Sequence, residues 1–211
     1  IERRDQLPEI IDELGLKVGA EIGVCEGAFS DHLLTNSSLD VLHSIDAWTE
    51  DAQQTMSSFK QCDIRGDNID KRYKTTINRL SKHGQRAIIT RALSLDACKT
   101  YPDHYFDFIY LDASHRFSGF ALDMIYWWPK LKTGGVFAGH DFWTRYRYET
   151  CYCTNGFCIE MKQFYYLTYG ERPMFPASWY LQKTDRTKEE YLNGFPEWQR
   201  ELERQAKAIH D

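Results

Sequence analysis

The segment GAEIGVCEGAFSDHLL, residues 19–34, joins a short apolar run to a helical pattern. Glu21 lies in the apolar run, and Gly23 and Gly27 come after it. Glycines at a strand-to-helix turn allow a ligand to approach the backbone N–H groups, because they carry no Cβ. An acid ahead of the glycines favours a positively charged ligand over a pyrophosphate, and the dinucleotide pattern G-x-G-x-x-G is absent from the turn. The same residues also fit a tight turn that binds nothing.

Short apolar runs alternate with helical patterns along the rest of the chain. This alternation predicts an α/β fold in which helices cover a parallel sheet. The expected strands are VGAEIGV (18–24), DVLHSIDAW (40–48), RAIITRAL (86–93), YFDFIYLDAS (105–114), GGVFAGHDF (134–142) and SWYLQKT (178–184). The expected helices are QLPEIIDEL (6–14), FSDHLLTN (29–36), KRYKTTINRLSKHG (71–84), LDACKTYP (95–102), GFALDMIYWWPKLK (119–132), FCIEMKQFYYLTYG (157–170) and a C-terminal helix in residues 187–211.

The 211 residues are expected to form one domain. A leading helix in residues 1–16 precedes a core in residues 17–141 that contains the glycine turn. Residues 49–70 and 142–156 are candidate lids, and the second includes an aromatic-rich stretch suited to cover a ligand. The polar C-terminal helix fits packing on the domain or on a second copy, so a homodimer is one expectation.

Composition excludes several classes of partner. The net charge of −5 gives no basic footprint for nucleic acid. No apolar run is long enough to span a bilayer, so no membrane partner is expected. The six cysteines include no C-x-x-C pair, which favours reduced thiols and a cytoplasmic location.

The stretch EIGVCEGAFS (21–30) resembles the first motif of class I S-adenosylmethionine-dependent methyltransferases, in the form found in small-molecule O-methyltransferases. The resemblance runs from Gly19 to Asp141. It implies a Rossmann-like, doubly wound, mostly parallel seven-stranded sheet with S-adenosylmethionine as cofactor. The implied cofactor contacts are Glu21, Gly23, Gly27 and Ser30 at the methionine end, Asp46 at the ribose, Leu93 and Ser94 near the adenine, and Asp112. Glu26 departs from the small or hydroxylated residue common at its position, and it is expected to face ribose or solvent.

A second group of polar residues ends two later strands. Asp112 and His115 follow the fourth expected strand, and His140 and Asp141 end the fifth. The carboxyl ends of parallel strands meet at one edge of the sheet, where open α/β folds place their sites. His140 beside Asp141 also fits a structural hydrogen-bonded pair.

Two interpretations of this group remain open. In the first, Asp112, His140 and Asp141 bind a divalent cation such as Mg²⁺ or Mn²⁺, which lowers the pKa of a substrate hydroxyl. Metal-dependent O-methyltransferases that resemble this chain carry a lysine at the position of His115 and a carboxylate at that of His140. In the second interpretation there is no metal. His115 is then a general base poised near pH 7, with Asp112 or Asp141 fixing its tautomer.

These observations together predict an S-adenosylmethionine-dependent methyltransferase that methylates a hydroxyl of a small metabolite, a sugar or an aromatic. The sequence D-x-x-H, followed by WWPKLKTGG and GHD, resembles a methyltransferase subgroup that acts on sugars and other hydroxylated metabolites. Two alternatives stay open: a nicotinamide-dependent oxidoreductase and a catalytically silent nucleoside-binding module.

Overall fold

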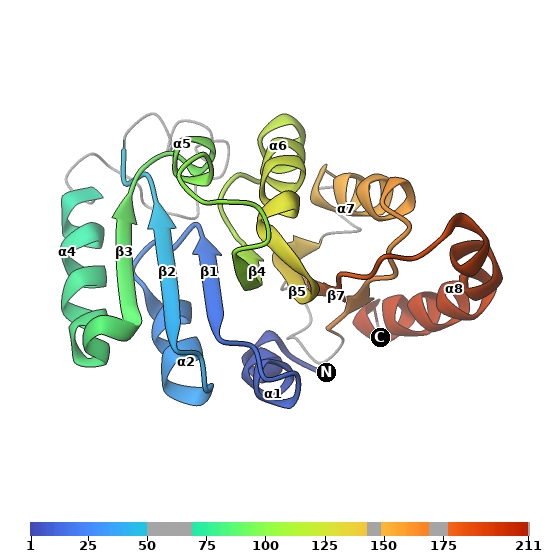
Figure 1. Ribbon diagram of the computed structural model, residues 1–211, viewed down its shortest axis with the longest axis horizontal. Helices are drawn as coiled ribbons and strands as arrows, with labels where there is room; N and C mark the ends of the chain where they lie inside the picture. Colours follow the sequence, from blue (N-terminus) through green and yellow to red (C-terminus); the bar gives the residue numbers. More distant parts are fainter. Residues whose placement is uncertain (50–68, 143–148, 169–176, 211) are drawn as a thin grey trace.

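A seven-stranded sheet forms the centre of the molecule (Figure 1). The computed structural model describes residues 1–49, 69–142, 149–168 and 177–210, with side chains up to residue 204. The strand order is β3-β2-β1-β4-β5-β7-β6. The strands are β1 (Val18–Ile22), β2 (Val41–Asp46), β3 (Ala87–Arg91), β4 (Phe106–Leu111), β5 (Leu131–Phe142), β6 (Tyr166–Leu167) and β7 (Ala177–Gln182). The first five strands pair in parallel, and β7 runs antiparallel to both β5 and β6. The expected mostly parallel, doubly wound sheet is confirmed.

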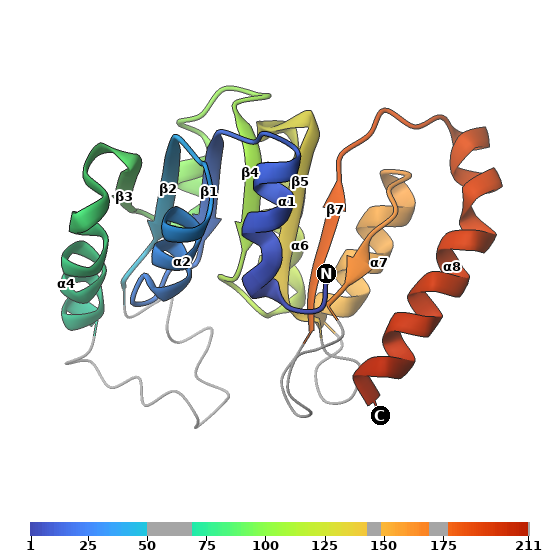
Figure 2. The same cartoon turned by 90° about the horizontal axis from the view of Figure 1, so that it is seen from below.

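Helices cover both faces of this sheet. In Figures 1 and 2, α1 and α2 lie on one face, while α5, α6 and α7 lie on the other. The helices are α1 (Leu7–Glu13), α2 (Ala28–Asn36), α4 (Ile69–Leu80), α5 (Ser94–Cys98), α6 (Phe117–Trp127), α7 (Glu149–Glu160) and α8 (Lys188–His210), with 3₁₀ turns η1 (Arg4–Gln6), η3 (Ser81–Arg86) and η4 (Trp128–Lys130). Within the described ranges, no helix combines the length and the apolar character needed to cross a membrane.

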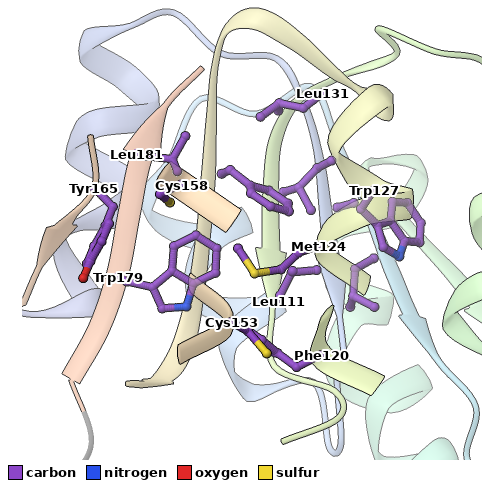
Figure 3. Close-up of a cluster of buried hydrophobic side chains, with 14 of the residues drawn as sticks. Leu111, Phe120, Met124, Trp127, Leu131, Cys153, Cys158, Tyr165, Trp179 and Leu181 are labelled. Atoms are coloured by element: carbon purple, nitrogen blue, oxygen red, sulfur yellow. The ribbon is translucent and has the colours of Figure 1, made fainter. Parts of the chain in front are cut away.

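Each face of the sheet has its own hydrophobic core, because central parallel strands are buried on both sides. The larger core lies under α6 and α7, where Trp127 and Trp179 are fully buried (Figure 3). The second core lies under α1 and α2 and includes Leu7, Leu33 and Tyr110. These two cores fix the carboxyl ends of β1, β2 and β4 at one edge of the sheet.

One expectation about the later part of the chain, a helix in residues 157–170, was wrong. The helix expected in residues 157–170 ends at Glu160, and Tyr166–Leu167 forms β6 instead. Lys162 has a positive φ, and the aromatic residues after it suit a strand better than a helix. The candidate lid in 142–156 stays a prediction; its second half belongs to α7 and packs against the core through Cys153.

The other candidate lid, residues 49–70, lies largely outside the described residues. Its last two residues begin α4. Residues 143–148 also lie outside the described part of the chain.

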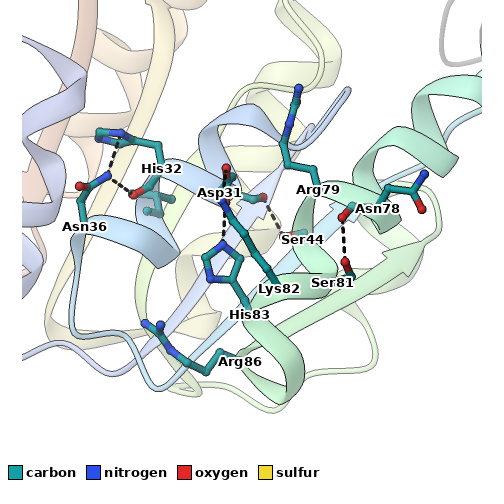
Figure 4. A network of polar contacts seen from close by, with 12 residues as sticks. Asp31, His32, Asn36, Ser44, Asn78, Arg79, Ser81, Lys82, His83 and Arg86 are labelled. Atoms are coloured by element: carbon teal, nitrogen blue, oxygen red, sulfur yellow. Dashed lines mark hydrogen bonds and ion pairs between the residues drawn. The ribbon is translucent and has the colours of Figure 1, made fainter.

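A polar network fixes α2 beside the turn between α4 and β3 (Figure 4). Asp31 on α2 lies 2.6 Å from His83 Nε2 and 2.8 Å from Lys82 Nζ. Asn36 also donates to the His32 backbone carbonyl at the end of α2. These contacts of Asp31 hold α2, and so the glycine turn that precedes it, beside the segment that contains Lys82 and His83.

A substitution at Gly23 tests how tightly the turn is packed. Gly23 has a φ of +92°, and a Cβ there would lie 2.2 Å from the Asp112 carbonyl oxygen. Gly134 has a similar φ of +84° but has open space around it, so it is a matched control. We expect Gly134→Ala to lower the free energy of unfolding by ~1 kcal/mol and Gly23→Ala to lower it by ~3 kcal/mol or more. Urea denaturation of both variants measures the difference, and equal losses would contradict the close contact.

Candidate active site

The glycine turn joins the carboxyl ends of three strands. The Gly23 N–H donates to the Ile45 carbonyl at 2.9 Å, and the Asp112 N–H donates to the Ile22 carbonyl at 2.8 Å. Gly23 thus lies directly against the backbone at the end of β4. Gly27 has a φ of +75° and caps the start of α2. The close contact with Asp112 is sufficient to explain why position 23 is a glycine. The turn that begins at Gly23 lies at the carboxyl edge of the sheet.

Glu21 lies beneath this turn, with 2% of its surface exposed. The Ser30 hydroxyl donates to Glu21 Oε2 and lies 2.7 Å from the Ser44 hydroxyl. Burial raises the pKa of Glu21 to about 8, although the hydrogen bond from Ser30 lowers it. In the free protein, Glu21 is therefore mainly uncharged at pH 7. A cation placed above the turn would favour its charged form.

Asp46 at the end of β2 clamps the turn from the side. Its Oδ2 accepts the N–H groups of Val24 and Cys25 at 2.9 and 2.8 Å, and its Oδ1 accepts the Trp48 N–H at 3.0 Å. A carboxylate oxygen has two acceptor sites, so Oδ1 can accept a further hydrogen bond from a ligand. Glu26 is exposed, and its contact with a cofactor stays a prediction.

Several residues that support the turn were not expected from the sequence. The Cys25 carbonyl accepts hydrogen bonds from Trp48 Nε1 at 2.8 Å and from the Thr76 hydroxyl at 3.0 Å. The Trp48 and Tyr73 rings lie 4.9 Å apart, and the Arg91 guanidinium lies over Tyr73. Thr76 and Tyr73 belong to α4, where nothing in the local sequence distinguishes them from other residues on the helix.

Leu93 and Ser94 differ in what they offer a ligand. The Ser94 hydroxyl donates to Asp123 Oδ1 at 2.5 Å and accepts from Trp127 Nε1 at 2.9 Å. Burial raises the pKa of Asp123 to about 6, against the lowering effect of Ser94. This network joins α5 to α6 and occupies the Ser94 hydroxyl. Leu93 precedes α5 and is 52% exposed, so its predicted contact with adenine remains open.

The second polar group converges on one imidazole. His115 Nε2 lies 3.2 Å from Asp112 Oδ1 and 2.7 Å from Asp141 Oδ2. Ligand atoms of these three residues all lie within 4.8 Å of one another, a spacing at which they could hold a metal ion. The expected metal set contained His140 in place of His115. His140 Nδ1 instead lies 3.4 Å from Asp141 Oδ1, at the margin of the group.

The two carboxylates change the charge state of His115. Burial lowers the pKa of the imidazole, but Asp112 and Asp141 outweigh burial and raise it to about 10. Burial would raise the pKa of Asp141, yet its bonds to His115 and His140 hold it well below its usual range. His115 is therefore a cation at pH 7 in the free protein. The expectation that it is poised near pH 7 is wrong for this form.

Two further features adjoin the Asp112–His115–Asp141 cluster. Asp141 has a φ of +56°, a left-handed conformation that is uncommon for a residue with a side chain and is often found at functional sites. Its backbone carbonyl accepts the Thr150 hydroxyl. On the opposite side, Arg4 Nη1 lies 3.8 Å from Asp112 Oδ2. No pattern in the sequence indicates that the segment before α1 reaches the site.

Comparison with known proteins places this geometry in context. Residues 20–142 match the model of a family described as a methyltransferase domain. An O-methyltransferase from Bacillus cereus, solved in complex with SAH, has 14% identity and a TM-score of 0.60, over 85% of this chain and 80% of that one. No curated protein sequence gives a match.

Two other structural neighbours have different activities in their names. An rRNA methylase from Streptococcus thermophilus has 12% identity and a TM-score of 0.57, over 86% of this chain and 93% of that one. Spermidine synthase from Thermotoga maritima has 13% identity and a TM-score of 0.58, over 98% of this chain and 72% of that one. At such identities the neighbours show the fold alone. Because the family model spans more than half of the chain, the protein belongs to the methyltransferase-domain family, with the Rossmann-like fold of the class I S-adenosylmethionine-dependent methyltransferases.

Proposed function

We propose that the protein methylates a hydroxyl oxygen of a small metabolite, a sugar or an aromatic. The observation that carries this proposal is the contact between the glycine turn and the Asp112–His115–Asp141 cluster. Gly23 lies against the backbone of Asp112, so the residues that would hold the cofactor adjoin those that would manage a proton. The net charge of −5 supports a small acceptor over a nucleic acid.

The charges at this edge fit the cofactor of the family. When bound, S-adenosylmethionine supplies a methyl group on a positively charged sulfur. Asp46 has acceptor capacity for ribose hydroxyls at the end of β2. Asp46, Asp112 and Asp141 favour a sulfonium compound over a dinucleotide, because their carboxylates would repel a pyrophosphate. This charge distribution disfavours the nicotinamide alternative.

Transfer to a hydroxyl requires that the protein align the acceptor and remove its proton. His115 lies where two strand ends meet and is the group best placed for proton transfer. As a cation held by two carboxylates, it must first release its own proton. The two carboxylates therefore hold the imidazole ring in place. They also stabilise its protonated form, which cannot act as a base.

A divalent cation fits the same three residues. Two carboxylate oxygens and one imidazole nitrogen form a donor set suited to Mn²⁺, and to Mg²⁺ if water completes the shell. Such an ion would lower the pKa of a bound hydroxyl. Asp112 and Asp141 would then no longer stabilise the charged imidazole, so the pKa of His115 would fall.

Cofactor binding can be tested with two matched aspartates. We expect Asp46→Ala to weaken S-adenosylhomocysteine binding by ~10-fold or more, because it removes a ribose acceptor and loosens the turn. Asp107 also accepts two backbone N–H groups, those of Lys17 and Val18, but at the opposite end of β1. Asp107→Ala should cost comparable stability and leave the affinity unchanged. Calorimetric titration of both variants measures this, and equal affinities would count against the role of Asp46.

The base can be identified with labelled cofactor and a panel of hydroxylated sugars and phenols. His115→Gln should bind S-adenosylhomocysteine with near-normal affinity and lose at least ~100-fold in turnover of the acceptor that the wild type methylates. His140→Gln is the control. His140 lies beside Asp141 at the margin of the cluster, so this variant should retain most of the activity. If His115→Gln methylates the acceptor at the full rate, His115 is not the base.

The pH dependence separates the metal-bound form from the metal-free form. Only the neutral imidazole accepts a proton, and the pKa of His115 is raised to about 10 in the free protein. With EDTA present, we expect initial rates to rise with pH from 7 toward 10. With Mn²⁺ present, the rise should move to lower pH, because the ion would lower the pKa of the bound hydroxyl. Full activity at pH 7 under complete chelation would contradict both the metal and the raised pKa.

A further inference from the structure

Arg4 brings a positive charge to an edge of the sheet that is rich in acids. Its guanidinium lies 3.8 Å from Asp112 Oδ2 and stacks over the Phe29 ring, 5.1 Å from the ring centroid. Phe29 is in the first turn of α2, directly after the glycine turn. Arg4 therefore lies between the start of α2 and the end of β4. Its charge also acts on buried Glu21 and lowers the pKa of that carboxyl, against the dominant effect of burial.

The backbone around Arg4 is held firmly in this position. Arg4 opens η1, and the carbonyl of the next residue, Asp5, lies 2.8 Å from His32 Nε2 on α2. Leu7 follows and is 1% exposed in the core under α1 and α2. The Gln6 side chain accepts the Arg3 N–H at 3.2 Å. These contacts make Arg4 a fixed part of the edge.

We propose that Arg4 binds the carboxylate of the methionine part of the cofactor. This inference rests on the proposed function. S-adenosylmethionine carries two positive groups and one carboxylate, and Asp112 would repel that carboxylate unless a cation faces it. His115 is engaged by Asp112 and Asp141. The guanidinium of Arg4 is planar, and its N–H groups match the geometry of a carboxylate, so Arg4 is suited to bind this group at the edge of the sheet.

The test compares two ligands that differ in one carboxylate. S-adenosylhomocysteine and its decarboxylated analogue are titrated into wild type, Arg4→Met, Arg4→Lys and Arg3→Ala. Arg4→Met keeps an apolar chain over Phe29 and removes the charge, while Arg4→Lys restores the charge. Arg3 belongs to the same segment but pairs with the exposed Asp5 at 3.0 Å, so Arg3→Ala is the control.

We expect Arg4→Met to weaken S-adenosylhomocysteine by about ten- to a hundred-fold and to change the affinity of the decarboxylated analogue by less than about two-fold. Arg4→Lys should recover part of the loss, and Arg3→Ala should bind both ligands as the wild type does. An unchanged affinity for S-adenosylhomocysteine, or an equal loss for both ligands, would overturn the role of Arg4. Failure of the wild type to bind either ligand would instead overturn the proposed function.

Discussion

The approach of Gly23 to the backbone of Asp112 couples the two halves of the site. A side chain at position 23 would collide with a carbonyl oxygen, and the neighbouring Asp112 N–H is bonded to Ile22. The glycine turn and the end of β4 are therefore one rigid unit of backbone. If the protein transfers a methyl group as proposed, the spacing between donor and proton acceptor is set by paired strands, which vary less than side-chain rotamers.

The acids gathered at this edge are accommodated in three different ways. Glu21 is buried and takes up a proton, with Ser30 as its partner. Asp46 accepts two backbone N–H groups, which need no countercharge. Asp112 and Asp141 share His115 as a cation. A ligand that brings positive charge close to Glu21 would favour the charged form of this buried carboxyl.

Local patterns in the sequence were sufficient for most of the fold and for part of the site. Apolar runs and glycine stops located β1 to β5, and the acid-glycine spacing located the turn, because both signals lie within a few residues. The helix expected in residues 157–170 ends at Glu160 because Tyr166 pairs with β7, a contact distant in sequence. The contacts of Ser94 with Asp123 and of Arg4 with Asp112 are likewise fixed only by the folded chain, so local sequence patterns do not predict them.

The edge of the sheet at β6 is unusually short, and α8 packs beside it. Trp198 on α8 donates its indole N–H to the Tyr165 carbonyl at 2.7 Å, directly before the two residues of β6. A short, covered edge gives little backbone for a foreign strand to pair with. The cover that α8 gives β6 therefore leaves little backbone at this end of the sheet that could pair with a strand of another chain.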